Sequence, residues 1–133
     1  MFKDKGICGQ SEMFVDDKNR MILPEYTGAE PGENLVIVRN KESKCYDVYD
    51  EEHYTEKLKI QIDYLENKLK ITIELEKREK LQLLLNDIYT SILAKVTCDT
   101  KKRIVVTSIL EESEKINKVK AIGAFDHLML RKK

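Results

Sequence analysis

The sequence has few of the residues that interrupt helices and strands, with two prolines and five glycines among 133 residues. It also lacks any apolar run long enough to cross a membrane, and its first ten residues hold no apolar stretch of signal-peptide length. Scarce proline and glycine argue against a disordered chain. The missing apolar runs predict a soluble, cytoplasmic protein without a membrane partner.

Cysteine is also scarce, since only Cys8, Cys45 and Cys98 occur and no Cys-x-x-Cys pair is present. An odd number of widely spaced cysteines predicts reduced thiols, which we expect to pack as small core residues. The two histidines, His53 and His127, are 74 positions apart, without a ligand spacing that indicates a metal site. We therefore predict no metal and no other cofactor.

The chain has no net charge, which by itself does not indicate a nucleic-acid partner. The charges are nevertheless uneven along the sequence. Residues 1–50 carry 7 Lys and Arg against 10 Asp and Glu, residues 51–95 carry 8 against 9, and residues 96–133 carry 9 against 5. A neutral protein can still present a basic surface, because binding follows the local charge.

One short pattern occurs twice in the sequence, Asp-x-Lys-x-Arg followed by an apolar run. Its members are Asp16, Lys18 and Arg20 in the first copy, and Asp99, Lys101 and Arg103 in the second. Asp and Asn favour turns, so each copy is predicted to form the tip of a hairpin. Segments with alternating apolar residues or many β-branched residues predict eight strands, some beside the turns and some further along the chain. These are residues 11–16, 20–23, 34–39, 45–50, 93–99, 103–107, 118–125 and 127–133.

Between the two copies, residues 51–93 change to a helical pattern. Apolar residues recur every three or four positions, first at Tyr54, Leu58, Ile62, Leu65, Leu69 and Ile73, then at Leu81, Leu84, Leu85, Ile88 and Ile92. This pattern predicts either one bent helix or a helical hairpin broken at residues 71–75. The stripe predicts core packing or, as the alternative, a coiled-coil oligomer interface. Residues 108–117 predict a further short helix.

The order strand, turn, strand, connector and two-strand hairpin recurs in both halves, which indicates an internal duplication. The sequence resembles the MraZ family and, more broadly, the AbrB/SpoVT swapped-hairpin DNA-binding fold. The resemblance is carried by the two Asp-x-x-x-Arg turns, by Gly9, by MILP after the first turn, by GAEPGENLVIVR, by KCYDVYDEEHYTEKL and by KVKAIGAFDHLMLRKK. The residue before each arginine is glycine in the family pattern; here it is Asn19 and Lys102.

The resemblance implies an α+β fold in which two swapped-hairpin halves form one small β-barrel. The expected parts are a first half at residues 1–57, a helical connector at 58–95 and a second half at 96–133 that shares a core with the first. It also implies a homo-oligomer, ring-like in this family, that contacts successive short repeats in a promoter. The weak contacts of the individual subunits with DNA would then combine to give a higher overall affinity.

For DNA, the two turns supply suitable side chains. Arg20 and Arg103 suit phosphate or the N7/O6 edge of guanine, and Lys18, Lys101 and Lys102 suit phosphates. Asp16 and Asp99 are expected to hold the turns and orient the arginines. The sequence thus predicts a cytoplasmic, nucleoid-associated transcription regulator that binds double-stranded DNA. The alternative is a protein-interaction or scaffold module, such as an antitoxin-like partner; no residue constellation indicates an enzyme.

Overall fold

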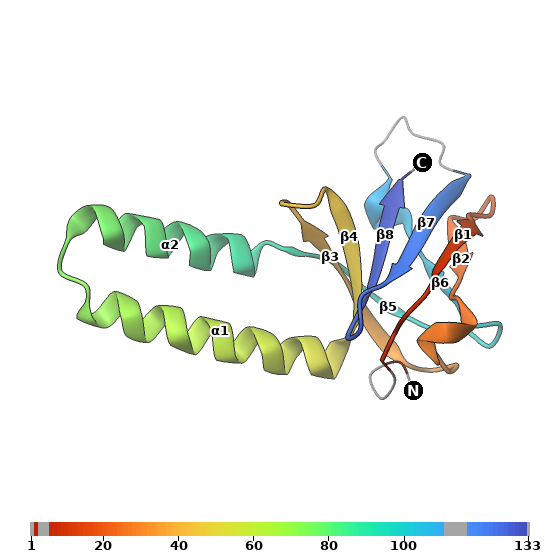
Figure 1. Ribbon diagram of the computed structural model, residues 1–133, viewed down its shortest axis with the longest axis horizontal. Helices are drawn as coiled ribbons and strands as arrows, with labels where there is room; N and C mark the ends of the chain where they lie inside the picture. The colour runs from red at the N-terminus through yellow and green to blue at the C-terminus, as the bar shows by residue number, and fades with distance from the viewer. Residues whose placement is uncertain (1, 3–5, 111–116, 133) are drawn as a thin grey trace.

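The computed structural model describes residues 2, 6–110 and 117–132, and these form an α+β fold with two α-helices and eight antiparallel strands (Figure 1). All eight predicted strands have a counterpart. Their bounds are β1 Gln10–Phe14, β2 Arg20–Ile22, β3 Asn34–Asn40, β4 Cys45–Asp50, β5 Ile92–Thr97, β6 Arg103–Val105, β7 Lys118–Gly123 and β8 Leu128–Lys132. The α+β class predicted from the sequence is therefore confirmed.

Six of the strands form one sheet in the order β1-β7-β8-β4-β3-β5, and β2 and β6 form a separate two-stranded ribbon. Segments from the two ends of the chain take turns in this order, as β1, then β7 and β8, then β4 and β3, then β5. Thus β1 pairs with β7, β4 with β8, and β3 with β5, while the hairpins β3–β4 and β7–β8 pair locally. The amino-terminal and carboxy-terminal segments are interleaved as a result.

The prediction that each Asp-x-Lys-x-Arg turn is the tip of a hairpin is wrong, because the two strands beside each turn do not pair with each other. The turns exist, but beyond the isolated bridge from Val15 to Met21 the strands β1 and β2 separate. β1 continues along β7, whereas β2 pairs with β6, and β5 likewise pairs with β3 rather than with β6. A local pattern predicts a chain reversal well, but apolar faces on distant segments decide which strands pair.

The main core lies between the sheet and the ribbon and draws side chains from both ends of the chain. Alternation along the strands creates it: Leu35 and Ile37 of β3 point into it, as do Val119 and Ala121 of β7. Its other members include Phe2, Ile7, Val15, Met21, Leu23, Val48, Cys98, Ile104, Val106, Ile109, Leu128 and Leu130. Cys45 and Cys98 are buried as predicted, but Cys8 is exposed.

The central segment forms a helical hairpin, here called the arm, of α1 Glu51–Ile71 and α2 Leu75–Tyr89. Of the two predicted alternatives, one bent helix or a helical hairpin, the structure has the hairpin, and its break lies within the predicted residues 71–75. Asp50 caps α1, since its carboxylate accepts a hydrogen bond from the backbone N–H of His53 at 3.0 Å. At the break, Arg78 Nη1 donates to the carbonyls of Leu69 and Thr72.

Figure 1 shows the arm extending from one side of the strands, while β1, β2 and β6 lie at the other. At the base of the arm, Tyr54 packs against Val36, Val38 and Tyr49 on the sheet face opposite the main core. Of the predicted helical stripe, Ile73 lies in the break and is 95% exposed, and Ile92 belongs to β5. Neither described helix is long and apolar enough to span a membrane.

A further prediction concerns the connector after β6. Residues 108–117 were expected to form a short helix. A single 3₁₀ turn covers Thr107–Ile109, and residues 111–116 lie outside the described part of the chain.

Gly9 has a φ of 150°, a backbone conformation that favours glycine, and a Cβ there would lie 2.9 Å from the Tyr26 ring. The glycine that carries part of the family resemblance is therefore required by the close approach of Tyr26.

Candidate nucleic-acid interface

The first turn is held by the carboxylate of Asp16, which accepts three hydrogen bonds from residues that follow it. Oδ1 accepts from the backbone N–H groups of Lys18 at 3.0 Å and Arg20 at 2.7 Å, and Oδ2 accepts from Nε of Arg20 at 2.9 Å. The backbone closes the same loop, because the N–H of Asp16 donates to the carbonyl of Arg20 at 3.0 Å. Asp16 therefore both builds the turn and orients the arginine.

The second turn repeats this arrangement bond for bond. Oδ1 of Asp99 accepts from the N–H groups of Lys101 at 2.9 Å and Arg103 at 2.8 Å, and Oδ2 accepts from Nε of Arg103 at 2.7 Å. The N–H of Asp99 donates to the carbonyl of Arg103 at 3.0 Å. The expected orienting role of the two aspartates thus has a geometric basis in both copies.

The residue before each arginine has a left-handed backbone, with φ of 59° at Asn19 and 59° at Lys102. The N–H of each donates to the carbonyl of the aspartate three residues earlier, at 3.0 Å in both turns. Asparagine tolerates this conformation, whereas lysine pays a steric penalty for its Cβ. These are the positions where the family pattern has glycine, which adopts such a φ without strain.

The ribbon joins the two turns directly. Arg20 pairs with Val105 and Ile22 with Arg103 in the antiparallel register. Two more hydrogen bonds extend the pairing into the turns, from Val106 N–H to the Asn19 carbonyl at 2.7 Å and from Leu23 N–H to the Lys102 carbonyl at 2.8 Å. Each turn is thereby attached to the strand that leaves the other turn.

The ribbon has one buried and one outer face, as expected from a period of two. Met21 and Ile104, at the centre, are 0% and 1% exposed and belong to the main core. The outer face carries Arg20, Ile22, Arg103 and Val105, which we call the ribbon face. Because Arg20 lies opposite Val105, two residues from Arg103, the two arginine positions are diagonal neighbours, about 7–8 Å apart at the backbone.

The two arginines are only partly exposed, with 27% of the Arg20 side chain and 20% of the Arg103 side chain accessible. Each uses Nε for its aspartate, at 2.9 and 2.7 Å. Within the described residues, no other hydrogen bond to either guanidinium is found, so the Nη groups are available to a ligand. A guanidinium oriented in this way loses little freedom when it binds a planar or anionic acceptor.

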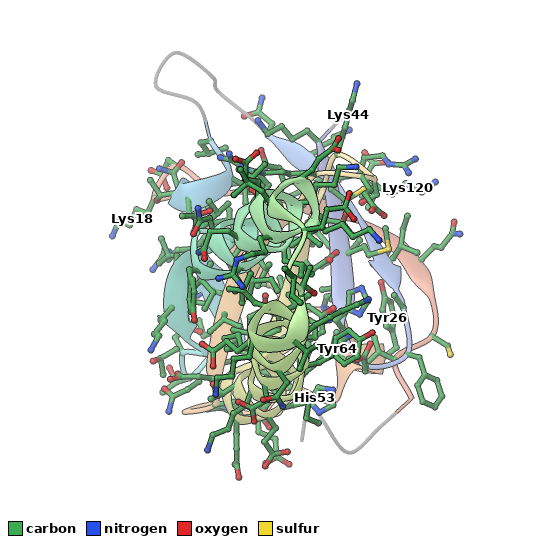
Figure 2. All side chains as sticks on the ribbon, turned by 90° about the vertical axis from the view of Figure 1, so that its left-hand side faces the viewer. Lys18, Tyr26, Lys44, His53, Tyr64 and Lys120 are labelled. Atoms are coloured by element: carbon green, nitrogen blue, oxygen red, sulfur yellow. The ribbon has the colours of Figure 1, made fainter. Side chains whose placement is uncertain are left out.

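The lysines of the two turns, Lys18, Lys101 and Lys102, are all exposed. Figure 2 shows Lys18 at the outer edge of the molecule, with its amino group pointing into solvent. The turns differ in charge, because residue 17 is aspartate and the equivalent residue 100 is threonine. The second turn is therefore the more basic of the two and is expected to attract an anion more strongly.

The electrostatics of the turns favour ionised aspartates. Hydrogen bonds from Arg20, first from its backbone N–H and then from its guanidinium, hold the pKa of Asp16 below its usual value against a smaller opposing effect of burial. At Asp99, burial raises the pKa, but hydrogen bonds from the N–H and guanidinium of Arg103 and from the N–H of Lys101 together outweigh it and lower the pKa. Both ion pairs thus remain formed across the neutral range.

No protein-family model matches the sequence, and neither does any curated protein. The function is therefore argued from the geometry of the site.

Sequence reasoning missed the apolar members of the ribbon face. Ile22 is 54% and Val105 is 46% exposed, which is high for large apolar side chains. Each follows an arginine by two residues, so strand alternation was a signal that places it on the arginine's face.

Sequence reasoning also missed a polar cluster at the base of the arm. Asp126, in the turn between β7 and β8, accepts from His127 Nδ1 at 2.7 Å, His53 Nε2 at 3.2 Å and Lys57 Nζ at 3.4 Å. His127 Nε2 also lies 3.6 Å from Asp47 Oδ1, and burial raises the pKa of Asp47. No set of three side chains suited to a metal occurs in the described part of the chain. The cluster joins the arm to the β7–β8 turn.

Proposed function

We propose that this protein is a sequence-specific, double-stranded DNA-binding transcription regulator that uses the ribbon face, with the duplicated swapped-hairpin fold that the MraZ and AbrB/SpoVT families share. The observation that carries the proposal is the repeated turn. Two aspartates orient two arginines in the same way, and the β2–β6 pairing brings both arginines to one face. A nucleoid-associated, cytoplasmic location follows from the same proposal.

The strand pairing supports a duplication. If β1, β2, β3 and β4 are taken as the counterparts of β5, β6, β7 and β8, the pair β1–β7 corresponds to β5–β3, and the hairpin β3–β4 corresponds to β7–β8. The pairs β2–β6 and β4–β8 correspond to themselves. An approximate two-fold axis through both self-paired elements accounts for the whole pattern, as expected for two swapped copies in one chain.

The residue types of the ribbon face suit the edges of base pairs. Arginine donates two hydrogen bonds to guanine N7 and O6, and apolar side chains contact the thymine methyl group. Arg20 and Arg103 would take the first role, and Ile22 and Val105 the second. A two-stranded ribbon has the width that the major groove admits. Lys18, Lys101 and Lys102 would neutralise phosphates on either side.

The absence of net charge is compatible with this proposal if several copies act together. One ribbon face with two arginines and three nearby lysines makes few phosphate contacts, so a single chain would bind weakly at physiological salt. The family resemblance implies a ring-like homo-oligomer on successive short repeats. Linked weak sites of this kind raise the overall affinity without any new contact.

The test is binding of the purified chain to random genomic DNA fragments, compared with an Arg20→Ala/Arg103→Ala double variant. The control is Arg39→Ala/Arg131→Ala, which removes the same charge from exposed residues elsewhere. We expect binding that weakens as salt rises, loss of at least about tenfold in affinity in the first variant, and little change in the control. Sequencing the bound fragments would give the preferred site.

If both double variants lost the same affinity for DNA, the loss would reflect only the removal of positive charge. That result would count against specific binding by the ribbon face. Failure of the folded protein to bind any fragment at low salt would reject DNA binding. The alternative, a protein-interaction or scaffold module, is favoured by the exposed Ile22 and Val105. It predicts a protein complex that forms equally well with Arg20→Ala/Arg103→Ala.

A further inference from the structure

The arm leaves a groove between its two helices, on one side of the hairpin, with a volume of about 700 Å³. Its walls include Gln61, Tyr64 and Leu65 of α1 and Leu84, Asp87 and Ile88 of α2. At the base of the arm the groove is closed by the sheet. We call this surface the arm groove; Figure 2, viewed from the side of the arm, shows Tyr64 at its α1 edge.

The arm groove is lined by polar and apolar side chains, and its apolar ones on the two helices are exposed. Tyr64 is 62% and Leu84 is 51% exposed, while the only buried residues of the two helices are Tyr54 and Leu85. Beyond the contact of Tyr54 with the sheet, the two helices pack mainly on each other and bury little apolar surface, although most helical stability in proteins comes from such burial. Exposed apolar side chains gathered in a groove indicate a binding site.

Three cations at or beside the arm groove have no carboxylate partner in the described part of the chain, whereas the lining residues Lys41 and Lys57 are paired with Asp87 and Asp126. Arg39 lines its base, and Lys68 and Lys80 lie one helical turn from Tyr64 and Leu84 on the same sides of their helices. None of the three has a carboxylate within ion-pair distance among the described residues; Lys68 Nζ contacts the Tyr64 hydroxyl at 3.4 Å.

The acidic residues of the arm groove are largely occupied. Asp87 pairs with Lys41 at 3.0 Å. Asp47 is 5% exposed and accepts from Asn40. Glu42 is the exposed acid that remains among the described lining residues. The arm groove therefore combines exposed apolar side chains with nearby cations that have no carboxylate partner among the residues that the structure describes.

We propose that the arm groove binds an acidic amphipathic helix of a partner protein and so completes a three-helix bundle. Apolar residues of that helix at i, i+3, i+4 and i+7 would pack on Tyr64, Leu65 and Leu84, and its flanking carboxylates would pair with Lys68 and Lys80. The arm of a second copy fits less well, because in a two-fold arrangement the same cations of both copies line the shared surface.

This inference does not rest on DNA binding, and the two are compatible in space. The arm groove lies at one side of the molecule, whereas the ribbon lies beyond the sheet at the other side (Figure 1). In the view of Figure 2, Lys18 lies at the outer edge of the molecule, whereas Tyr64 lies near the middle, on the arm that faces the viewer. A helix in the arm groove leaves the ribbon face accessible.

The experiment measures binding of two labelled, designed helical peptides to the full chain by fluorescence anisotropy. Both are about 15 residues long, the length of α2, with leucines at the same positions; one has glutamate and the other lysine on its flanks. We expect the acidic peptide to bind, and Leu84→Asp to weaken it by about tenfold or more. Leu75→Asp is the matched control, since Leu75 is 70% exposed and nine residues from Leu84, half a turn around α2.

A charge reversal keeps the test decisive if Leu84→Asp disturbs the arm. Lys68→Glu/Lys80→Glu should bind the lysine peptide better than the glutamate peptide, with circular dichroism showing an intact arm. Equal binding of both peptides to the natural chain, or no effect of Leu84→Asp on a folded arm, would overturn the proposal. So would sedimentation of the chain alone as a dimer that Leu84→Asp dissociates, because a second copy then occupies the arm groove.

Discussion

At the scale of single residues, the protein depends on side chains that complete backbone geometry. Asp16 and Asp99 replace missing backbone hydrogen bonds in their turns and, with the remaining oxygen, orient an arginine. This double role was predictable, because an aspartate that begins a turn and precedes an arginine by four residues has both partners within reach. The strain at Lys102 does not follow from lysine itself, because it depends on the φ that the closed turn imposes.

Replacing Lys102 by glycine is expected to stabilise the protein. The lysine has a φ of 59°, which glycine adopts without a steric penalty. The gain exceeds the extra entropy of glycine in the unfolded chain, so Lys102→Gly should raise the free energy of unfolding by about 0.5–1 kcal/mol. Urea unfolding followed by circular dichroism measures this. Asn19→Gly is the control and should gain less, since asparagine tolerates the conformation; a destabilised Lys102→Gly would contradict the strain argument.

At the scale of elements, the arm is attached to the strands at few points. Tyr54 packs on the sheet, Asp50 caps α1, and Asp126 connects α1 to the β7–β8 turn. The helices and their break followed from apolar periodicity and a β-branched segment, which are local properties. The contact of Asp126 with His53 and Lys57 did not follow, because about 70 residues separate them and the sheet topology brings them together.

Asp126→Asn is expected to lower stability at neutral pH but not in acid. Burial raises the pKa of Asp126, but hydrogen bonds from His127 and His53 and the charge of Lys57 outweigh it and lower the pKa to about 2. Because the pKa of Asp126 is lower in the folded state than its unfolded value of about 3.9, the ionised carboxylate stabilises the folded protein at pH values above about 3.9. This contribution to the free energy of unfolding is lost as the pH falls toward about 2.

The loss in Asp126→Asn should be about 1–2 kcal/mol at pH 7, reduced from the full value because a third of the side chain is exposed. It should disappear between about pH 4 and pH 2. Thermal unfolding across this range measures it, with the exposed arm residue Asp63→Asn as control. A loss independent of pH would assign the effect to packing rather than to charge.

At the scale of the whole molecule, strands from both ends of the chain share one core. Met21 and Ile104 pair at the centre of the ribbon and bury their side chains under the sheet. Neither end of the chain has a complete core by itself, because every long strand of one end pairs with a strand of the other. We therefore expect the strands to unfold as one cooperative unit.

Ile104→Ala should test this coupling. Ile104 is 1% exposed, so its truncation leaves a cavity and should cost about 2–5 kcal/mol. Denaturant unfolding should give one transition at the same midpoint by tyrosine fluorescence and by circular dichroism of the strands. Val105→Ala, its neighbour on the outer face, should cost less than about 1 kcal/mol. Two separate strand transitions would show that the ends fold independently.

The sequence by itself determined the features that depend on near neighbours. These are the two turns closed by Asp16 and Asp99, the strands with alternating burial, and the helical segment with a weak point at residues 71–75, which left open a bent helix or a hairpin. Only the tertiary structure decided the features that need distant partners. Strand pairing is chosen by the shared core, so the place of Arg20 beside Val105 and of Arg103 beside Ile22 appears only when both ends of the chain are folded together.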